Sequence, residues 1–266
     1  MSSGAGRRYT GMTSLLSDKV AIIYGAGGGI GRGVAHTFAR EGATVHLVGR
    51  SPEPLDALAA EITAAGGKAD VAVVDALDED AVAAHTRKVG RVDISFNLIR
   101  RGDVQGIALL DLSTDDLLAP IVTGTRTAFI TARAAARVMV EQGSGVILTL
   151  TSASSAGLAP NMGGTGPADA AVETLMRYLA AEVGPRGVRV VGLWAAGVPE
   201  SFPETADDAR GGLDRDRIDA MMSGMSLLRR ATHLPELAET AAFLASDQAR
   251  AITATIVNVS CGLVVR

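Results

Sequence analysis

Short runs of apolar, mostly β-branched residues alternate along this chain with longer segments in which apolar residues recur every three or four positions. A strand covered on both faces of a sheet has no polar face, so the short runs predict buried strands of a parallel sheet. The longer segments have the spacing of amphipathic helices, and several are followed by a glycine, which often ends a helix. The predicted strands span 20–24, 45–48, 71–74, 94–97, 146–151, 188–193 and 256–260, and the predicted helices span 30–41, 54–65, 80–89, 121–142, 167–184 and 234–246.

This order of elements predicts a single α/β domain over residues 18–266, with a seven-stranded parallel sheet and helices on both faces. Two segments do not follow the pattern. Residues 1–17 lack the apolar stretch of a signal peptide and are predicted to be a flexible tail. Residues 199–217 carry six acidic residues with almost no apolar periodicity. This surface excursion is interpreted either as a lid over a binding site or as a plain solvated insertion.

Composition and charge exclude several classes of protein. Of the 266 residues 31 are glycine and only 3% are aromatic, so many tight turns and a core of Ala, Val, Ile and Leu are expected. The net charge is −4 and no run is rich in Lys or Arg, which argues against nucleic acid as a partner. No apolar run approaches the ~18 residues of a membrane span. The single Cys261 forms no internal disulfide and the four histidines are scattered, so a cytoplasmic protein without a bound metal is expected.

The strongest local motif is the glycine-rich stretch 25–31, which follows the first predicted strand and opens the first predicted helix. In such a turn the backbone N–H groups approach a pyrophosphate closely, and the helix N-terminus stabilises its charge. A turn that only packs a strand on a helix is the alternative, but the position along the chain favours a dinucleotide site. The candidate binding residues are Gly25, Gly28, Gly29, Ile30 and Gly31.

The residue at the end of the second predicted strand bears on the choice of dinucleotide. A site for NAD usually has an acidic residue there for the ribose 2′-hydroxyl, whereas this chain has Arg50. An arginine can stack on adenine and pair with a 2′-phosphate, so NADP(H) is favoured over NAD(H). A solvent-facing arginine is the alternative. Asp75, at the end of the third strand, either accepts from the adenine amino group or begins the next loop.

The glycine turn and four further segments resemble the short-chain dehydrogenase/reductase family in their order and spacing. These segments span 25–31, 92–97, 146–157, 182–190 and 243–247. The resemblance implies a Rossmann-type, doubly wound α/β fold, a nicotinamide cofactor near the retained Asn97, and oxidation of alcohols or reduction of carbonyls in a small-molecule substrate. It also implies a homodimer or homotetramer joined through the helices 121–142 and 167–184.

Family members usually catalyse with an Asn, Ser, Tyr and Lys set, and of these four only the serine matches here. Ser152 corresponds to the residue that holds the substrate oxygen, whereas the tyrosine and lysine positions are Thr165 and Asp169, and the asparagine position is Gly124. A tyrosine beside an ammonium group exchanges a proton near neutral pH, but a threonine hydroxyl is too weak an acid. Ser152, Thr165 and Asp169 are therefore the candidate catalytic residues of a site in which the usual mechanism is not expected.

Asp169 has two interpretations. With Gly166 as N-cap and Pro167 as the first residue, Asp169 is the third residue of a helix, where its charge suits the helix dipole. Alternatively it acts at the site as a general base, which requires burial to raise its pKa. Arg100 and Arg101 either form an exposed loop pair, hold a carboxylate or phosphate of the substrate, or pair with Asp169.

Three functions fit this combination of motifs. The favoured one is an oxidoreductase in which hydride passes between NAD(P)(H) and a substrate held by Ser152. The second is a non-redox enzyme, such as an isomerase, cyclase or dehydratase, that uses Asp169, Ser152 and Arg100. The third is a catalytically silent cofactor-binding protein or partner subunit. Tyr24, which precedes the glycine turn, is expected to pack in the core rather than to supply a phenol near the cofactor.

Overall fold

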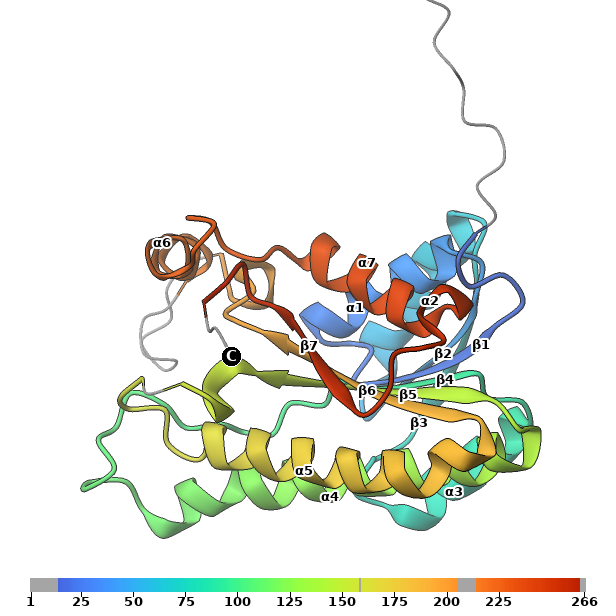
Figure 1. Cartoon of the computed structure of the whole chain (residues 1–266). Coiled ribbons are helices and arrows are strands. Elements are labelled where there is room, and N and C mark those ends of the chain that lie inside the picture. Colours follow the sequence, from blue (N-terminus) through green and yellow to red (C-terminus); the bar gives the residue numbers. More distant parts are fainter. Residues whose placement is uncertain (1–13, 158, 205–213, 264–266) are drawn as a thin grey trace, which may run out of the picture.

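The short apolar runs form a seven-stranded parallel sheet in the computed structural model, which describes residues 14–157, 159–204 and 214–263. Residues 1–13 of the predicted tail and residues 205–213 of the predicted excursion lie outside this description. The sheet has the order β3-β2-β1-β4-β5-β6-β7 (Figure 1). Its strands are β1 (Val20–Tyr24), β2 (Thr44–Gly49), β3 (Lys68–Val73), β4 (Ile94–Asn97), β5 (Gly145–Ser152), β6 (Val188–Ala195) and β7 (Thr255–Val259).

Helices cover both faces of this sheet (Figure 1). One face carries α1 (Gly29–Arg40), α2 (Pro52–Ala64) and α7 (Leu234–Ala245), and the other carries α3 (Glu79–Val89), α4 (Thr114–Gln142) and α5 (Thr165–Val183). The core follows the alternation of side chains along a strand. Ala21 and Ile23 of β1 belong to the apolar cluster under α1 and α7, whereas Ile22 and Tyr24 belong to the cluster under α4 and α5.

The predicted α/β fold, with a doubly wound seven-stranded sheet and helices on both faces, is confirmed. It was predictable because the central strands are short, largely apolar and mostly buried runs, which sequence periodicity reveals directly, whereas the edge strands β3 and β7 contain no buried residue. The four central strands β1, β4, β5 and β6 carry most of the fully buried residues of the sheet.

Helix α4 begins at Thr114, seven residues before the predicted start at 121. The prediction was wrong because Pro120 does not end the helix. Ser113 caps the first turn by accepting a hydrogen bond from Asp116 N at 3.1 Å, which offsets the bond that the proline cannot donate. The ring of Pro120 also packs where Gly164 leaves room, since a Cβ added there would lie 2.7 Å from Pro120 Cγ.

Helix α6 (Arg215–Met225) was not predicted, and its first three residues fall in the segment 199–217 that was interpreted as an excursion. Asp214 caps α6 by accepting from Arg217 N at 2.8 Å. Only Ile218 and Met222 of the helix are buried, so its apolar periodicity is short. The remainder of the described excursion contains the short helix η3 (Pro199–Ser201). The choice between a lid and a solvated insertion stays a prediction.

The order of the strands creates a crevice at one end of the sheet. β1 pairs with β2 on one side and with β4 on the other, so the winding direction reverses between β1 and β4. Ligands of open α/β sheets bind at the carboxyl ends of the strands at such a reversal. Within the described part of the chain, no helix is long and apolar enough to cross a membrane, and no cluster of three His, Cys, Asp or Glu residues is placed to hold a metal ion.

Candidate active site

The glycine turn lies at the carboxyl end of β1 and is packed so tightly that two of its glycines are required. Gly25 has a φ of +77°, and a Cβ there would lie 2.6 Å from Leu98 O. A Cβ on Gly31 would lie 2.8 Å from Ala26 Cα, inside the turn itself. Glycine is the residue that permits both the left-handed conformation and the close approach of helix and turn. The turn is therefore held as a backbone cradle.

Helix α1 begins directly after this cradle, and no side chain caps the backbone N–H groups of its first turn. Its N-cap is Gly28, which has no side chain to accept a hydrogen bond, and the first turn holds no acidic residue. The first N–H groups of a helix have no partner within it, and the helix dipole favours an anion at this end. Gly28, Gly29, Ile30 and Gly31 thus fit the pyrophosphate of a dinucleotide.

An outer cavity lies beside the turn, at the ends of β1, β2 and β3. It brings together Arg50 and Asp75, the two residues predicted to contact the adenosine half of the cofactor. Arg50 is exposed, and Asp75 Oδ1 accepts a hydrogen bond from Leu77 N at 3.0 Å. Asp75 therefore shapes the loop that it begins, and it also lines the cavity. The other lining residues include Tyr24, Gly25, Gly28, Gly49, Val74, Arg100, Thr123 and Thr127.

An inner cavity continues from the outer one, at the ends of β4, β5 and β6. Its wall is largely apolar, with a few polar groups that converge on it, as in many small-molecule sites. Arg100 lines both cavities and so stands at their junction. The lining includes Ile30, Asn97, Leu98, Ile99, Arg100, Arg101, Asp103, Gly124, Thr127, Ala128, Thr149, Leu150, Thr151, Ser152, Val172, Ala195 and Ala196.

Ser152, at the end of β5, is bonded to a buried carboxylate. Its Oγ donates to Asp169 Oδ2 at 2.5 Å, and its backbone N–H donates to the same oxygen at 3.1 Å. The hydroxyl oxygen also accepts from Ser154 N at 3.2 Å. Asp169 is 0% exposed, and burial raises its pKa above the ordinary value, whereas Arg101 and the hydrogen bonds from Ser152 act in the opposite direction. Ser152 thus links the inner cavity to a buried carboxylate behind it.

Arg101 forms the other contact of this carboxylate. Its Nη1 donates to Asp169 Oδ1 at 2.6 Å, and its Nε and Nη2 donate to Asp103 at 3.3 and 3.0 Å. Of the three interpretations of the Arg100–Arg101 pair, pairing with Asp169 therefore holds for Arg101, whose side chain is only 16% exposed. Arg100 is exposed, as an ordinary loop residue would be, but it also lines the cavities.

The interpretation of Asp169 as the third residue of a helix is wrong. Helix α5 begins at Thr165 with Gly164 as its N-cap, two residues before the predicted start at 167, so its first turn contains no acidic residue. Asp169 therefore lies beyond the first turn, where it bonds Ser152 and Arg101 rather than backbone donors of the helix. The alternative condition, that burial raises its pKa, is met.

Thr165 is not brought to the same place. It is 3% exposed, and its Oγ1 accepts a hydrogen bond from Gln105 Nε2 at 3.0 Å. Among the described residues that line the inner cavity, Ser152 is present and Thr165 is not. The hydroxyl of Thr165 thus fastens the loop before α4 to the start of α5.

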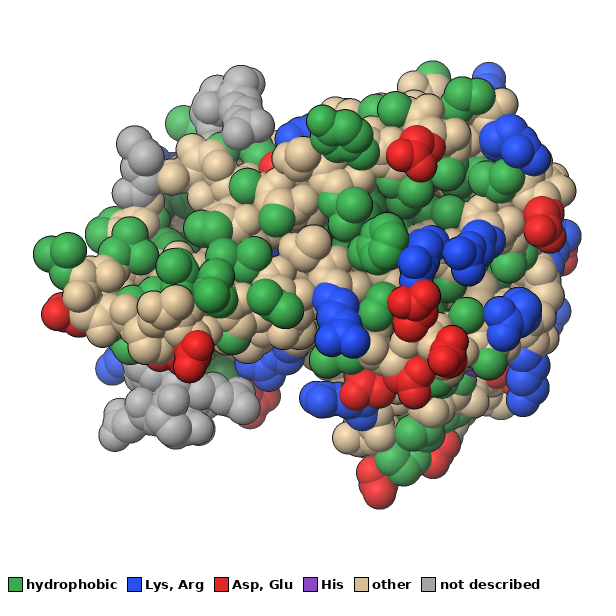
Figure 2. Space-filling model, turned by 90° about the horizontal axis from the view of Figure 1, so that it is seen from below, with side chains coloured by type: hydrophobic (Ala, Val, Ile, Leu, Met, Phe, Trp, Pro, Cys, Tyr) green, Lys and Arg blue, Asp and Glu red, His purple; other side chains and the backbone are tan. Residues whose placement is uncertain are grey.

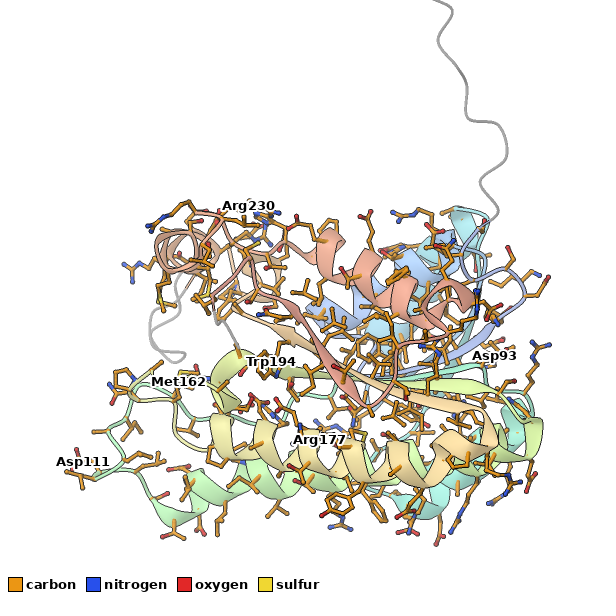
Figure 3. The ribbon with its side chains drawn as sticks, viewed as in Figure 1. Asp93, Asp111, Met162, Arg177, Trp194 and Arg230 are labelled. Carbon is orange, nitrogen blue, oxygen red and sulfur yellow. The ribbon has the colours of Figure 1, made fainter. Side chains whose placement is uncertain are left out.

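Sequence analysis missed Glu173, which lies one helical turn after Asp169 and is 5% exposed. Its Oε1 accepts from Thr151 Oγ1 at 3.2 Å, Ser155 Oγ at 2.7 Å and Trp194 Nε1 at 2.6 Å. Figure 3 shows Trp194 between the sheet and α5. These bonds hold together α5, β6 and both flanks of Ser152. The spacing of four residues from Asp169 was the available signal, because such residues share a helix face.

Asn97 and Tyr24 have structural roles in the walls. Asn97 Oδ1 accepts from Ile99 N at 3.0 Å, and its Nδ2 donates to Thr127 Oγ1 at 3.4 Å, which fixes the loop after β4. Tyr24 is fully buried, and burial raises its pKa to about 12. The expectation that Tyr24 packs in the core is therefore confirmed.

Comparison with known proteins covers nearly the whole chain. Residues 25–264 match the family model described as Enoyl-(Acyl carrier protein) reductase. The short-chain reductase protein NovJ of Streptomyces niveus is 32% identical over 261 residues, which span 92% of this chain and 94% of NovJ.

Two solved structures with bound nicotinamide cofactors are also similar. A 7α-hydroxysteroid dehydrogenase in complex with NADH and 7-oxo glycochenodeoxycholic acid is 28% identical, with a TM-score of 0.78 over 94% of this chain and 96% of the other. A protein from Beutenbergia cavernae described as an NAD(P)-dependent gluconate 5-dehydrogenase, with NADP bound, is 28% identical, with a TM-score of 0.80 over 93% and 97%.

Proposed function

This chain belongs to the short-chain dehydrogenase/reductase family of NAD(P)-dependent oxidoreductases, and we propose that it uses NADP(H) to interconvert a small alcohol and its carbonyl through a Ser152–Asp169 proton route. The observation that carries the proposal is the hydrogen bond from Ser152 Oγ, which lines the inner cavity, to the buried Asp169 Oδ2. It replaces the tyrosine and lysine of the usual family mechanism with a serine and a carboxylate.

The glycine turn and the outer cavity beside it support NADP(H) as the cofactor. Gly25, Gly28, Gly29, Ile30 and Gly31 form the cradle for the pyrophosphate. Arg50 offers an exposed guanidinium for a 2′-phosphate, and Asp75 lies on the same wall for the adenine amino group. Asn97 lines the inner cavity, where it would stand beside a bound nicotinamide. When bound, the nicotinamide accepts hydride from the substrate carbon or donates it.

The hydrogen bonds that Ser152 already makes determine which hydrogen bond it can form with a substrate. Its proton is given to Asp169, and one of its two lone pairs is taken by Ser154 N. A hydroxyl oxygen has one donor and two acceptor sites, so one acceptor site remains. That site suits the O–H group of an alcohol.

The substrate oxygen loses a proton as the substrate carbon loses its hydride. As the substrate C–H bond loses its hydride, the substrate O–H proton moves to Ser152 Oγ, and the proton of Ser152 moves to Asp169 Oδ2. The substrate becomes a carbonyl, the serine hydroxyl is regenerated and Asp169 holds one proton. In the reverse direction, the same two groups return the proton to the oxygen of the reduced carbonyl.

The test combines binding and turnover of the full chain. Calorimetry with NADPH, NADH, NADP⁺ and NAD⁺ is expected to show the tightest binding for the phosphorylated pair. A panel of small secondary alcohols with NADP⁺ is then expected to produce NADPH absorbance. Turnover of a substrate without change of the cofactor would instead identify a non-redox enzyme, and binding of none of the four nucleotides would overturn the cofactor assignment.

The proposed assembly is a homodimer or homotetramer joined through α4 and α5. The face formed by α3, α4 and α5 has hydrophobic side chains on its left and centre and charged side chains concentrated on its right (Figure 2). Val122 and Phe129 of α4 and Tyr178 of α5 are 57%, 44% and 70% exposed. Exposed apolar groups on two adjacent helices are typical of a protein interface.

A further inference from the structure

The side chain of Arg101 occupies a space that exists because residue 124 is glycine. A Cβ added to Gly124 of α4 would lie 2.5 Å from Arg101 Cδ and 3.2 Å from its Cγ. Cβ atoms in proteins essentially never approach a non-bonded heavy atom within 3.0 Å, so the arginine side chain would have to move. The glycine at the family's asparagine position and the arginine after β4 are thus one structural feature.

The charged end of Arg101 is held between two carboxylates. It meets Asp169 through Nη1 at 2.6 Å and Asp103 through Nε and Nη2. The guanidinium has its donors in a rigid planar fork, which suits two acceptors at once better than an ammonium group does. The side chain of Arg101 is 16% exposed and that of Asp169 is 0% exposed, so this ion pair is largely removed from water.

Asp169 depends on this cation to remain ionised. A buried carboxylate without a partner takes up a proton instead of keeping its charge. The charged groups around it are Arg101 and Asp103 from the loop after β4 and Glu173 from the next turn of α5, while α4 presents the uncharged Gly124 and Ala128 to the same cavity. Of the groups that contact Asp169, Arg101 carries the positive charge.

We propose that Arg101 is a positioning residue that keeps Asp169 ionised, and so able to accept a proton from Ser152. Gly124 leaves the space in which the Arg101 side chain lies. The inference rests on the proposed function and specifies how its proton route is controlled. Arg101 supplies positive charge from the loop after β4, at a site where the family's lysine supplies it from the helix. The ionisation of Asp169 therefore depends on Arg101, and the position of Arg101 depends on Gly124.

The direct test is a titration of the aspartate side-chain carbons by ¹³C NMR in the full chain, with the Asp169 signal identified by its loss in Asp169→Asn. Arg101→Met is expected to raise the titration midpoint of Asp169 by about one pH unit or more, because an adjacent cation favours the ionised carboxylate. Arg100→Met is the matched control, because it removes a neighbouring arginine that lacks the bond to Asp169, and it is expected to leave the midpoint unchanged. An unchanged midpoint in Arg101→Met would overturn the inference.

Two further variants allow the same titration if Arg101→Met does not fold. Gly124→Ala leaves the arginine in the chain but crowds it, and it is expected to shift the Asp169 midpoint in the same direction. Arg101→Lys retains a cation and is expected to restore part of the wild-type midpoint. Equal midpoints for the wild type and Gly124→Ala would refute the role of Gly124. A shift in these variants together with no binding of NADPH would uphold the ion-pair inference and reject the proposed function.

Discussion

Single residues of the site are understood best from the partners that each polar atom already has. Ser152 retains one acceptor position because Asp169 and Ser154 occupy its other two. Thr165 accepts a hydrogen bond from Gln105 and so has a structural role. These assignments depend on contacts between residues that are far apart in sequence, such as Arg101 and Asp169, which are 68 positions apart. The family resemblance identified Ser152 and Asp169 as candidates but left pairing with Arg101 as one of three interpretations.

Arg50→Ala tests the cofactor preference at the residue scale. We expect NADPH to bind about tenfold more weakly, about 1.4 kcal/mol, because a charge-assisted contact to the 2′-phosphate is lost. NADH lacks that phosphate, so its dissociation constant is expected to stay unchanged. Calorimetry with both cofactors measures the difference. Equal weakening of the two would show that Arg50 acts on the shared part of the molecule.

The pH dependence of turnover follows from the ionisation of Asp169. Alcohol oxidation requires the carboxylate, so its kcat/KM is expected to rise with pH, whereas carbonyl reduction requires the protonated acid and is expected to fall. Burial raises the pKa of Asp169, so both limbs are expected above the usual range of an aspartate. Profiles measured in the two directions check the sign. A shared direction for both reactions would contradict the assignment.

At the scale of elements, local signals were sufficient for the sheet and insufficient for two helices. Helix α4 continues through Pro120 because the cap at Ser113 and the space beside Gly164 stabilise its first turns. Helix α6 buries only Ile218 and Met222, which is too little periodicity to identify a helix. The glycine turn, in contrast, was predictable from its local pattern between a strand and a helix, although the contact that requires Gly25 is with Leu98, which follows β4.

Gly31→Ala tests whether the turn and α1 pack as closely as described. The added Cβ would lie 2.8 Å from Ala26 Cα. Crowding of this kind is expected to lower the free energy of unfolding by about 1–3 kcal/mol and to abolish dinucleotide binding. Urea denaturation and calorimetry measure the two effects. Gly224→Ala is the matched control, because a Cβ there meets nothing within 4 Å and alanine favours the helix, so no loss of stability is expected.

At the scale of the whole molecule, the family fold is retained while Gly124, Thr165 and Asp169 stand at three positions of the usual catalytic set. The seven strands of the sheet and the glycine turn follow from short-range patterns and were predicted, whereas the strand order and the crevice between β1 and β4 come from the folded chain. The Arg101–Asp169 pair and the Glu173 cluster join different elements, so they emerge only when the chain is folded. The assembly of copies of this chain is a further property at this scale.

Val122→Glu combined with Tyr178→Glu tests the proposed assembly. A charge on each of two exposed apolar positions of α4 and α5 is expected to shift the protein to the monomer, because burying an unpaired carboxylate in an interface is costly. Sedimentation velocity measures the change. Val73→Glu, on the edge strand β3 and 56% exposed, is the control that is expected to keep the wild-type state. An unchanged state in the double variant would place the interface elsewhere.

The Ser152–Asp169 proton route is tested most directly by comparing hydride transfer in the wild type and in Asp169→Asn, with the alcohol identified from the panel and NADP⁺. An amide at this position cannot take the proton from Ser152. We expect a loss of kcat of about 10²–10⁴-fold, the usual contribution of a positioned acid or base, with the NADPH dissociation constant unchanged. A variant that keeps the wild-type rate would show that Asp169 is outside the proton route, and the proposed mechanism would have to be abandoned.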